Sequence, residues 1–157
     1  MDFAQTSIHA AASSARPSDG RAATGRLLAL STAGAWTSVA RLDFAQGRTE
    51  SEVLAGPAVS GQSAGLLAMI GELVEPAQLG GVGGIDAIAF DAGPGAFTGL
   101  RVGCAVAQGL GFARDLPLLP VGSLEAAAWA SVRRTGVGQA VVLVASDARM
   151  GEIYVAL

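Results

Sequence analysis

The chain has 157 residues, of which 51% are hydrophobic and 15% are charged, and this composition suffices for one globular domain with its own core. Its formal net charge of -3 at pH 7 excludes a broad basic surface that would hold nucleic acid unaided. The single cysteine, Cys104, and the single histidine, His9, exclude an internal disulfide framework, a His/Cys metal cluster and a Ser-His-Asp triad.

Residues 1–25 are predicted to form a flexible N-terminal extension, because they are rich in Ala, Ser, Arg and Gly and lack sustained periodicity. Asp2 stands where a signal peptide would carry a basic residue, and no apolar segment reaches the roughly 20 residues that span a bilayer. We therefore expect a cytoplasmic protein without a membrane segment.

The folded part is expected to begin at Arg26 with a hairpin, a third strand and a helix. The runs with the length and composition of strands are residues 27–30, 36–42 and 48–54. Residues 61–74 then place apolar residues, Leu66 and Ile70 among them, at helical spacing, and Pro76 ends this helix.

The centre of the chain is a strand, a tight turn and a long helix, which together make the first half of a βαβ crossover. Residues 85–90 are an apolar run with the length of a buried strand, and residues 91–96 are a glycine-rich turn. Residues 97–114 keep a helical pattern throughout.

The helix at 97–114 carries a ridge almost without side chains, and a bulkier row lies beside it. The ridge consists of Gly99, Gly103, Ala107 and Gly111, and the row of Leu100, Cys104, Gln108 and Phe112. Each glycine inside a helix costs about 1 kcal/mol relative to alanine, so the ridge needs a compensating contact. Two explanations remain: the ridge packs on the domain's own sheet, or it contacts another protein.

A glycine turn before a helix also suggests phosphate binding, because free N–H groups and the helix dipole attract anions. The segment Gly93–Thr98 matches only the first two glycines of a dinucleotide fingerprint, and Pro94 removes one donor. The chain has no lysine, which excludes a Walker-type loop, and Asp91 adds negative charge where a phosphate would lie. Rigid turn geometry is the better explanation.

The remainder predicts two strands and a helix, then a final hairpin. The expected elements are a strand at 116–121, a helix at 124–132 with Ser123 as its N-cap, a strand at 140–145, a turn at 147–151 and a strand at 152–157. Because the chain stops inside the last strand, which would need a partner, we expect a truncated form of a longer protein.

Several charged residues that could be catalytic are better explained by structural roles. Arg101 lies near the positive end of its helix, so we expect an acidic or carbonyl partner, either in its own domain or across an interface. Asp147 is expected to cap its own turn. Asp86 and Asp91 are five residues apart on one strand and point to opposite faces, so they cannot form a paired carboxylate site.

The order of elements over residues 26–157 is that of an actin-like (ASKHA, ribonuclease H-type) lobe, an α/β fold with a mixed sheet flanked by helices. The sequence within it resembles the TsaB family, also called YeaZ. The resembling stretches are LLALSTA at 27–33, GPGAFTGLRVG at 93–103, AQGL at 107–110 and DARMGEIY at 147–154. The motif residues are Gly93, Pro94, Gly95, Thr98, Asp147, Arg149 and Gly151. A second lobe is expected after Tyr154.

The resemblance implies a non-catalytic subunit in the synthesis of threonylcarbamoyladenosine in tRNA, without a metal or cofactor of its own. Such a subunit binds the catalytic TsaD, with the ATPase TsaE joining the complex, reaches tRNA only through that complex, and can form a homodimer without TsaD. The resemblance also favours the interface explanation of the ridge. The implied interface residues are Gln62, Leu66, Ile70, Phe97, Gly99, Leu100, Arg101, Gly103, Cys104, Ala107 and Gly111.

Two comparisons within the superfamily limit the function further. TsaD carries a pair of metal-binding histidines on the helix after the short strand that follows the glycine motif. The corresponding helix of this chain starts with the residues GSLEAAA at 122–128, which contain no histidine. Ser31 stands where the family has aspartate, and Gln62 where many relatives have histidine. The alternative function is an actin-like nucleotide-binding enzyme such as a small-molecule kinase, which Ser31 and the missing lysine disfavour.

Overall fold

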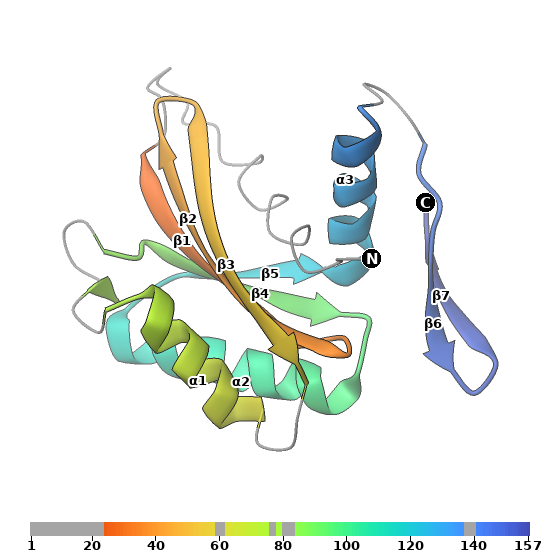
Figure 1. The fold of residues 1–157 in the computed structure, drawn as a ribbon. Coiled ribbons are helices and arrows are strands. Elements are labelled where there is room, and N and C mark those ends of the chain that lie inside the picture. Colours follow the sequence, from red (N-terminus) through yellow and green to blue (C-terminus); the bar gives the residue numbers. More distant parts are fainter. Residues whose placement is uncertain (1–23, 59–61, 76–77, 80–83, 137–140) are drawn as a thin grey trace.

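A computed structural model describes residues 24–58, 62–75, 78–79, 84–136 and 141–157, and it contains a five-stranded sheet in the order β3-β2-β1-β4-β5 (Figure 1). The first three strands are β1 (Gly25–Ser31), β2 (Trp36–Ala45) and β3 (Arg48–Pro57), and they pair antiparallel. The other two, β4 (Ala87–Gly93) and β5 (Leu118–Gly122), run parallel to β1. The predicted α/β fold with a mixed sheet is confirmed.

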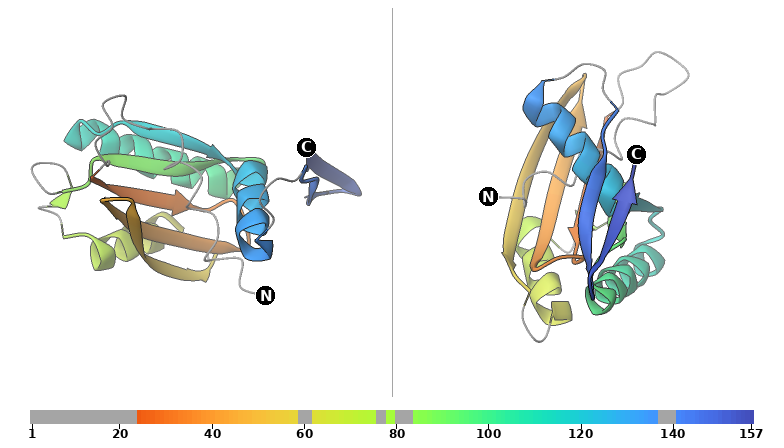
Figure 2. Two further views of the ribbon diagram at one scale, coloured as in Figure 1. Left: turned by 90° about the horizontal axis from the view of Figure 1, so that it is seen from above. Right: turned by 90° about the vertical axis from the view of Figure 1, so that its right-hand side faces the viewer.

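Helices lie on both faces of this sheet (Figures 1 and 2). Two of them, α1 (Gln62–Leu73) and α2 (Phe97–Arg114), pack side by side on one face, and α3 (Ser123–Thr135) lies on the other. A separate hairpin of β6 (Val144–Arg149) and β7 (Glu152–Ala156) follows α3 and contacts it. In the described part of the chain, no helix is both long enough and apolar enough to cross a membrane.

The core follows the alternation of side chains along the strands. Leu28, Leu30 and Val39 point to the face that α1 and α2 cover, and Leu66 and Ile70 of α1 pack on them. The opposite face holds Leu27, Ala29, Ala40, Leu42 and Ala89, and Val121 packs against this group. The middle of β1 is therefore buried on both faces, which explains its unbroken apolar run from Leu27 to Leu30.

The structure changes several predicted boundaries, and three of these changes have a clear physical cause. The central strand begins at Ala87 and continues to Gly93, because β5 keeps pairing with it past the expected turn. The strand expected at 140–145 starts only at Val144, whose partner Ala156 lies at the end of β7; Ala140 lies outside the described residues. Ser123 begins α3 instead of capping it, because its hydroxyl donates to Asp91.

The glycine ridge of α2 packs on the chain's own sheet. Gly99, Gly103, Ala107 and Gly111 are all buried. A Cβ atom at Gly99 would lie 1.9 Å from the carbonyl oxygen of Thr32, and one at Gly103 would lie 2.5 Å from the Thr32 hydroxyl. A Cβ at Gly111 would meet Leu118 at 2.8 Å. The first explanation of the ridge, internal packing, is therefore confirmed, and the ridge offers no outward surface.

We predict opposite effects for two glycine substitutions on α2. Gly99→Ala should lower the free energy of unfolding by about 2 kcal/mol or more, because the added methyl overpacks a buried backbone contact. Gly109→Ala should raise it by up to about 1 kcal/mol, because that position faces open space and alanine favours the helix. Urea unfolding of both variants measures this, and similar effects at the two sites would contradict the proposed packing.

Candidate functional site

An open cleft of about 1090 Å³ lies between the carboxyl ends of β1 and β4 and the β6–β7 hairpin. Ser31 and Asp91 line it from the sheet, and Asp147 and Arg149 from the hairpin. Its wall also contains the motif residues Pro94, Gly95 and Thr98, together with the aromatic residues Trp36, Phe97 and Tyr154. The cleft thus brings together two motifs that lie about 50 residues apart in the sequence.

Asp91 is the polar centre of the inner wall. Its carboxylate accepts hydrogen bonds from the Ser31 hydroxyl at 3.0 Å and from the Ser123 hydroxyl. The backbone N–H of Gly93 donates to the same carboxylate at 3.0 Å. Three elements, β1, β4 and α3, therefore meet at one side chain. The predicted separation of the acids is also confirmed, because Asp86 binds the backbone N–H of Arg26 at the other end of the strand.

The glycine turn is shaped by close contact with the turn after β1. Gly93 has a φ of 91°, which favours glycine, and the Gly93–Pro94 peptide is cis. A Cβ at Gly95 would lie 2.6 Å from the carbonyl oxygen of Ala33, and the same oxygen accepts the N–H of Ala96 at 2.7 Å. These contacts agree with the expectation that rigid geometry, not phosphate binding, requires the glycines.

The hairpin motif is organised by its own backbone. Asp147 accepts the N–H of Arg149 at 2.7 Å, which confirms the predicted turn cap. Arg149, Met150 and Gly151 have φ values of 66°, 54° and 80°, so the left-handed tip of the hairpin directs Met150 fully into solvent. Among the described residues, no group of three or more His, Cys, Asp or Glu side chains is arranged to hold a metal ion. His9 lies outside the described residues.

The residues expected at a partner interface lie in three different environments, and the side chain of one of them is outside the description. Leu66 and Ile70 belong to the buried core, as do the four ridge residues, because their face of each helix turns toward the sheet. Leu100 and Cys104 are half-buried. Phe97 and Arg101 are exposed. Gln62 begins α1, and its side chain lies outside the described residues.

Arg101 has a different contact from the one expected. Its guanidinium lies 3.9 Å from the centre of the Phe97 ring, one turn earlier on α2. An aromatic face attracts a cation without adding a negative charge. Within the described residues, the contact of Arg101 is therefore a ring of its own helix, and both side chains stay on the outer surface. A partner across an interface stays a prediction.

The outward side of the helix pair contains apolar residues that the sequence did not single out as exposed. On α2, the exposed residues Phe97, Arg101, Ala105, Gln108 and Phe112 recur every three or four positions. On α1, the corresponding stripe is Ala64, Leu67, Ala68 and Gly71. Leu67, Phe97 and Phe112 are 50%, 67% and 93% exposed. We call these two stripes the outer helical face. In the sequence, only the glycine ridge pointed to this face, because the ridge marks the inner side of α2 and thus leaves the opposite side to the solvent.

Comparison with known proteins gives one family match. The model of the family "TsaD: tRNA N6-adenosine threonylcarbamoyltransferase" matches residues 58–157. The tRNA threonylcarbamoyladenosine biosynthesis protein TsaB of Haemophilus influenzae is 45% identical over 89 residues, 57% of this chain and 36% of that protein. TsaB of Escherichia coli is 46% identical over 70 residues, 45% of this chain and 29% of that protein. This chain thus spans about a third of the length of these relatives.

The fold comparison covers more of the chain. The structure of YeaZ from Pseudomonas aeruginosa matches with a TM-score of 0.67 and 39% identity, over 83% of this chain and 58% of that one. Together with the strand order and the helices on both faces, this match confirms the expected actin-like, ribonuclease H-type lobe.

We predict that the Asp91 carboxylate is needed for stability. Asp91→Ala should lower the free energy of unfolding by about 2 kcal/mol, because it removes a charged acceptor shared by two hydroxyls and one N–H. Glu50→Ala on the exposed side of β3 is the control and should change it by less than about 0.5 kcal/mol. Equal effects in urea unfolding would show that Asp91 does not connect the three elements.

Proposed function

Because this chain belongs to the TsaD family of tRNA N6-adenosine threonylcarbamoyltransferases and, within it, to the TsaB/YeaZ group, we propose that it serves threonylcarbamoyladenosine biosynthesis as a non-catalytic subunit. Its direct partner in this proposal is the TsaD subunit, with TsaE joining the complex and tRNA reached only through it. A homodimer through the same surface forms when TsaD is absent, and the complex works in the cytoplasm.

The outer helical face is the observation that supports this proposal. Its exposed side chains are mostly apolar or small, with Arg101 and Gln108 as the polar groups of the α2 stripe. A solvent-facing helix normally carries charged and polar residues on its outer side. Phe112 and Phe97 supply large side chains of the kind that dominate binding energy at interfaces. The small residues of the α1 stripe would let a partner helix approach closely.

The inner residues of the two helices cannot test this proposal. A larger residue at Gly103 would collide with Thr32 and disturb folding, so lost binding would not locate the interface. Substitutions at Leu66 or Ile70 would likewise open cavities in the core. Exposed positions are the informative ones.

We predict that Phe112→Glu lowers the affinity for the TsaD subunit of the same organism at least tenfold, because a charge would be buried where the ring docks. Trp129→Glu on α3 is the matched control, since it places the same charge on an exposed aromatic position on the opposite sheet face. Light scattering after gel filtration detects the complex at the summed mass, and titration calorimetry gives the affinities. Separate elution of the wild-type full-length chain and TsaD would refute the proposed partnership.

A nucleotide-binding role for the cleft is the second candidate. Its position at the carboxyl ends of parallel strands and its volume favour it. Its charged side chains among the described residues are Asp91, Asp147 and Arg149, two acids and one base, which suits a polyphosphate poorly. The Asp91 carboxylate is also already bonded to Ser31 and Ser123.

We predict that titration calorimetry of the isolated chain with ATP and Mg²⁺ gives no saturable heat up to about 1 mM nucleotide, which corresponds to a binding free energy weaker than about -4 kcal/mol. Saturable binding that Arg149→Ala abolishes would instead make the cleft the functional site and favour the nucleotide-binding enzyme.

A further inference from the structure

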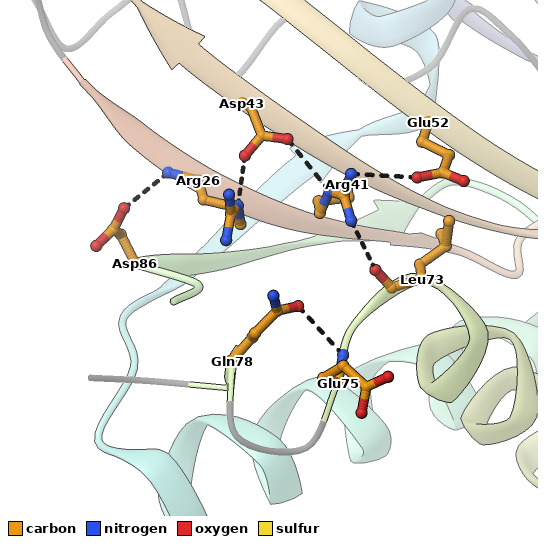
Figure 3. A network of polar contacts seen from close by, with 8 residues as sticks. All are labelled: Arg26, Arg41, Asp43, Glu52, Leu73, Glu75, Gln78 and Asp86. Carbon is orange, nitrogen blue, oxygen red and sulfur yellow. Dashed lines mark hydrogen bonds and ion pairs between the residues drawn. The ribbon is translucent and has the colours of Figure 1, made fainter. Parts of the chain in front are cut away.

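A network of charged side chains ties the C-terminal end of α1 to the sheet, with Arg41 of β2 at its centre (Figure 3). The Arg41 Nη1 group donates to the carbonyl oxygen of Leu73, the last residue of α1, at 3.0 Å. Its Nε lies 3.2 Å from a carboxylate oxygen of Asp43, and its Nη2 lies 3.2 Å from one of Glu52. Each of the three guanidinium nitrogens therefore has its own acceptor.

The bond to Leu73 meets a specific need of α1. The last carbonyl groups of a helix have no partner within it, and the C-terminal end carries partial negative charge. The last turn of α1 contains no basic residue of its own. Arg41, 32 positions earlier in the sequence, supplies both the donor and the positive charge from the sheet.

The guanidinium is itself held in place. Asp43 also binds the Nε of Arg26, whose backbone N–H donates to Asp86 at 2.7 Å. Glu52 stands directly opposite Arg41 in the β2–β3 ladder. The side chains of Arg41 and Asp43 are 28% and 34% exposed, so water competes only partly for their bond, whereas Glu52 is 59% exposed and its ion pair is weaker. A lysine at this position could not reach three acceptors with one ammonium group.

We propose that Arg41 is a positioning residue for the outer helical face. The core contacts of Leu66 and Ile70 are apolar and non-directional, so they constrain the rotation of α1 on the sheet less sharply than a hydrogen bond does. The hydrogen bond from Arg41 to Leu73 is directional and fixes the end of the helix. It thereby fixes the orientation in which α1 exposes the stripe of Ala64, Leu67, Ala68 and Gly71 to a partner. This inference rests on the proposed function, because it assumes that this face binds TsaD.

Two variants of the full-length chain test the inference. In Arg41→Met, amide hydrogen exchange in the last turn of α1, including the N–H of Val74 that bonds to Ile70, should become at least tenfold faster. The affinity for TsaD should fall at least fivefold at a temperature where the variant is fully folded. Arg41→Lys keeps the positive charge but cannot reach all three acceptors, so it should give the same two changes to a smaller extent. Arg48→Met, which removes an exposed arginine at the far end of the β2–β3 ladder, should change neither.

The outcomes separate this inference from the proposed function. If Arg41→Met or Arg41→Lys binds TsaD with wild-type affinity, the positioning role is overturned. The proposed binding to TsaD is then tested only by the affinity of the Phe112→Glu variant. Unchanged exchange in α1 in both variants overturns it as well, whatever the affinity. If the wild-type chain does not bind TsaD, the proposed function fails first, and the positioning role fails with it.

Discussion

The close contact between Thr32 and the N-terminal half of α2 is the constraint on which the rest of the structure depends. Thr32 is buried, its hydroxyl donates to the carbonyl oxygen of Gly99 at 2.7 Å, and its own carbonyl oxygen occupies the space of a missing Cβ at that glycine. The next residue, Ala33, accepts the N–H of Ala96 in the same way. The bond between Thr32 and Gly99 joins residues 67 positions apart, and together these contacts fix α2 against the first hairpin.

This constraint separates the two sides of α2. Because the inner side must have no side chains, the larger residues of the helix are confined to its flanks and outer side, where Phe97, Arg101 and Phe112 are exposed. The same contact holds the Gly93–Ala96 turn, which forms one wall of the cleft. The glycines at 95, 99 and 103 therefore have a structural cause, and the outer helical face follows from it.

Local patterns predicted the elements well and their environments less well. The bounds of α2 were predicted correctly, because a glycine turn precedes Phe97 and the left-handed residue Asp115 closes the helix after Arg114. Periodicity also showed that Leu66 and Ile70 share a side of α1, but it could not show which side faces the sheet. The roles of Thr32, Ser123 and Arg41 depend on partners 67, 32 and 32 positions away, and a single sequence does not indicate such pairings.

The carboxylate of Asp91 is engaged in hydrogen bonds within the fold. In an open α/β sheet, polar side chains at the carboxyl ends of parallel strands are usually available to a ligand. Here the carboxylate of Asp91 is shared by Ser31, Ser123 and the N–H of Gly93, so it joins β1, β4 and α3 instead. A carboxylate with these three donors is already stabilised as a structural acceptor, and a ligand would have to replace bonds that hold the sheet to α3.

The apolar side chains of the outer helical face have no such internal role, and burying them against a partner releases water at no cost in hydrogen bonds. The proposed binding through the helices would therefore break fewer existing hydrogen bonds than a ligand at Asp91 would.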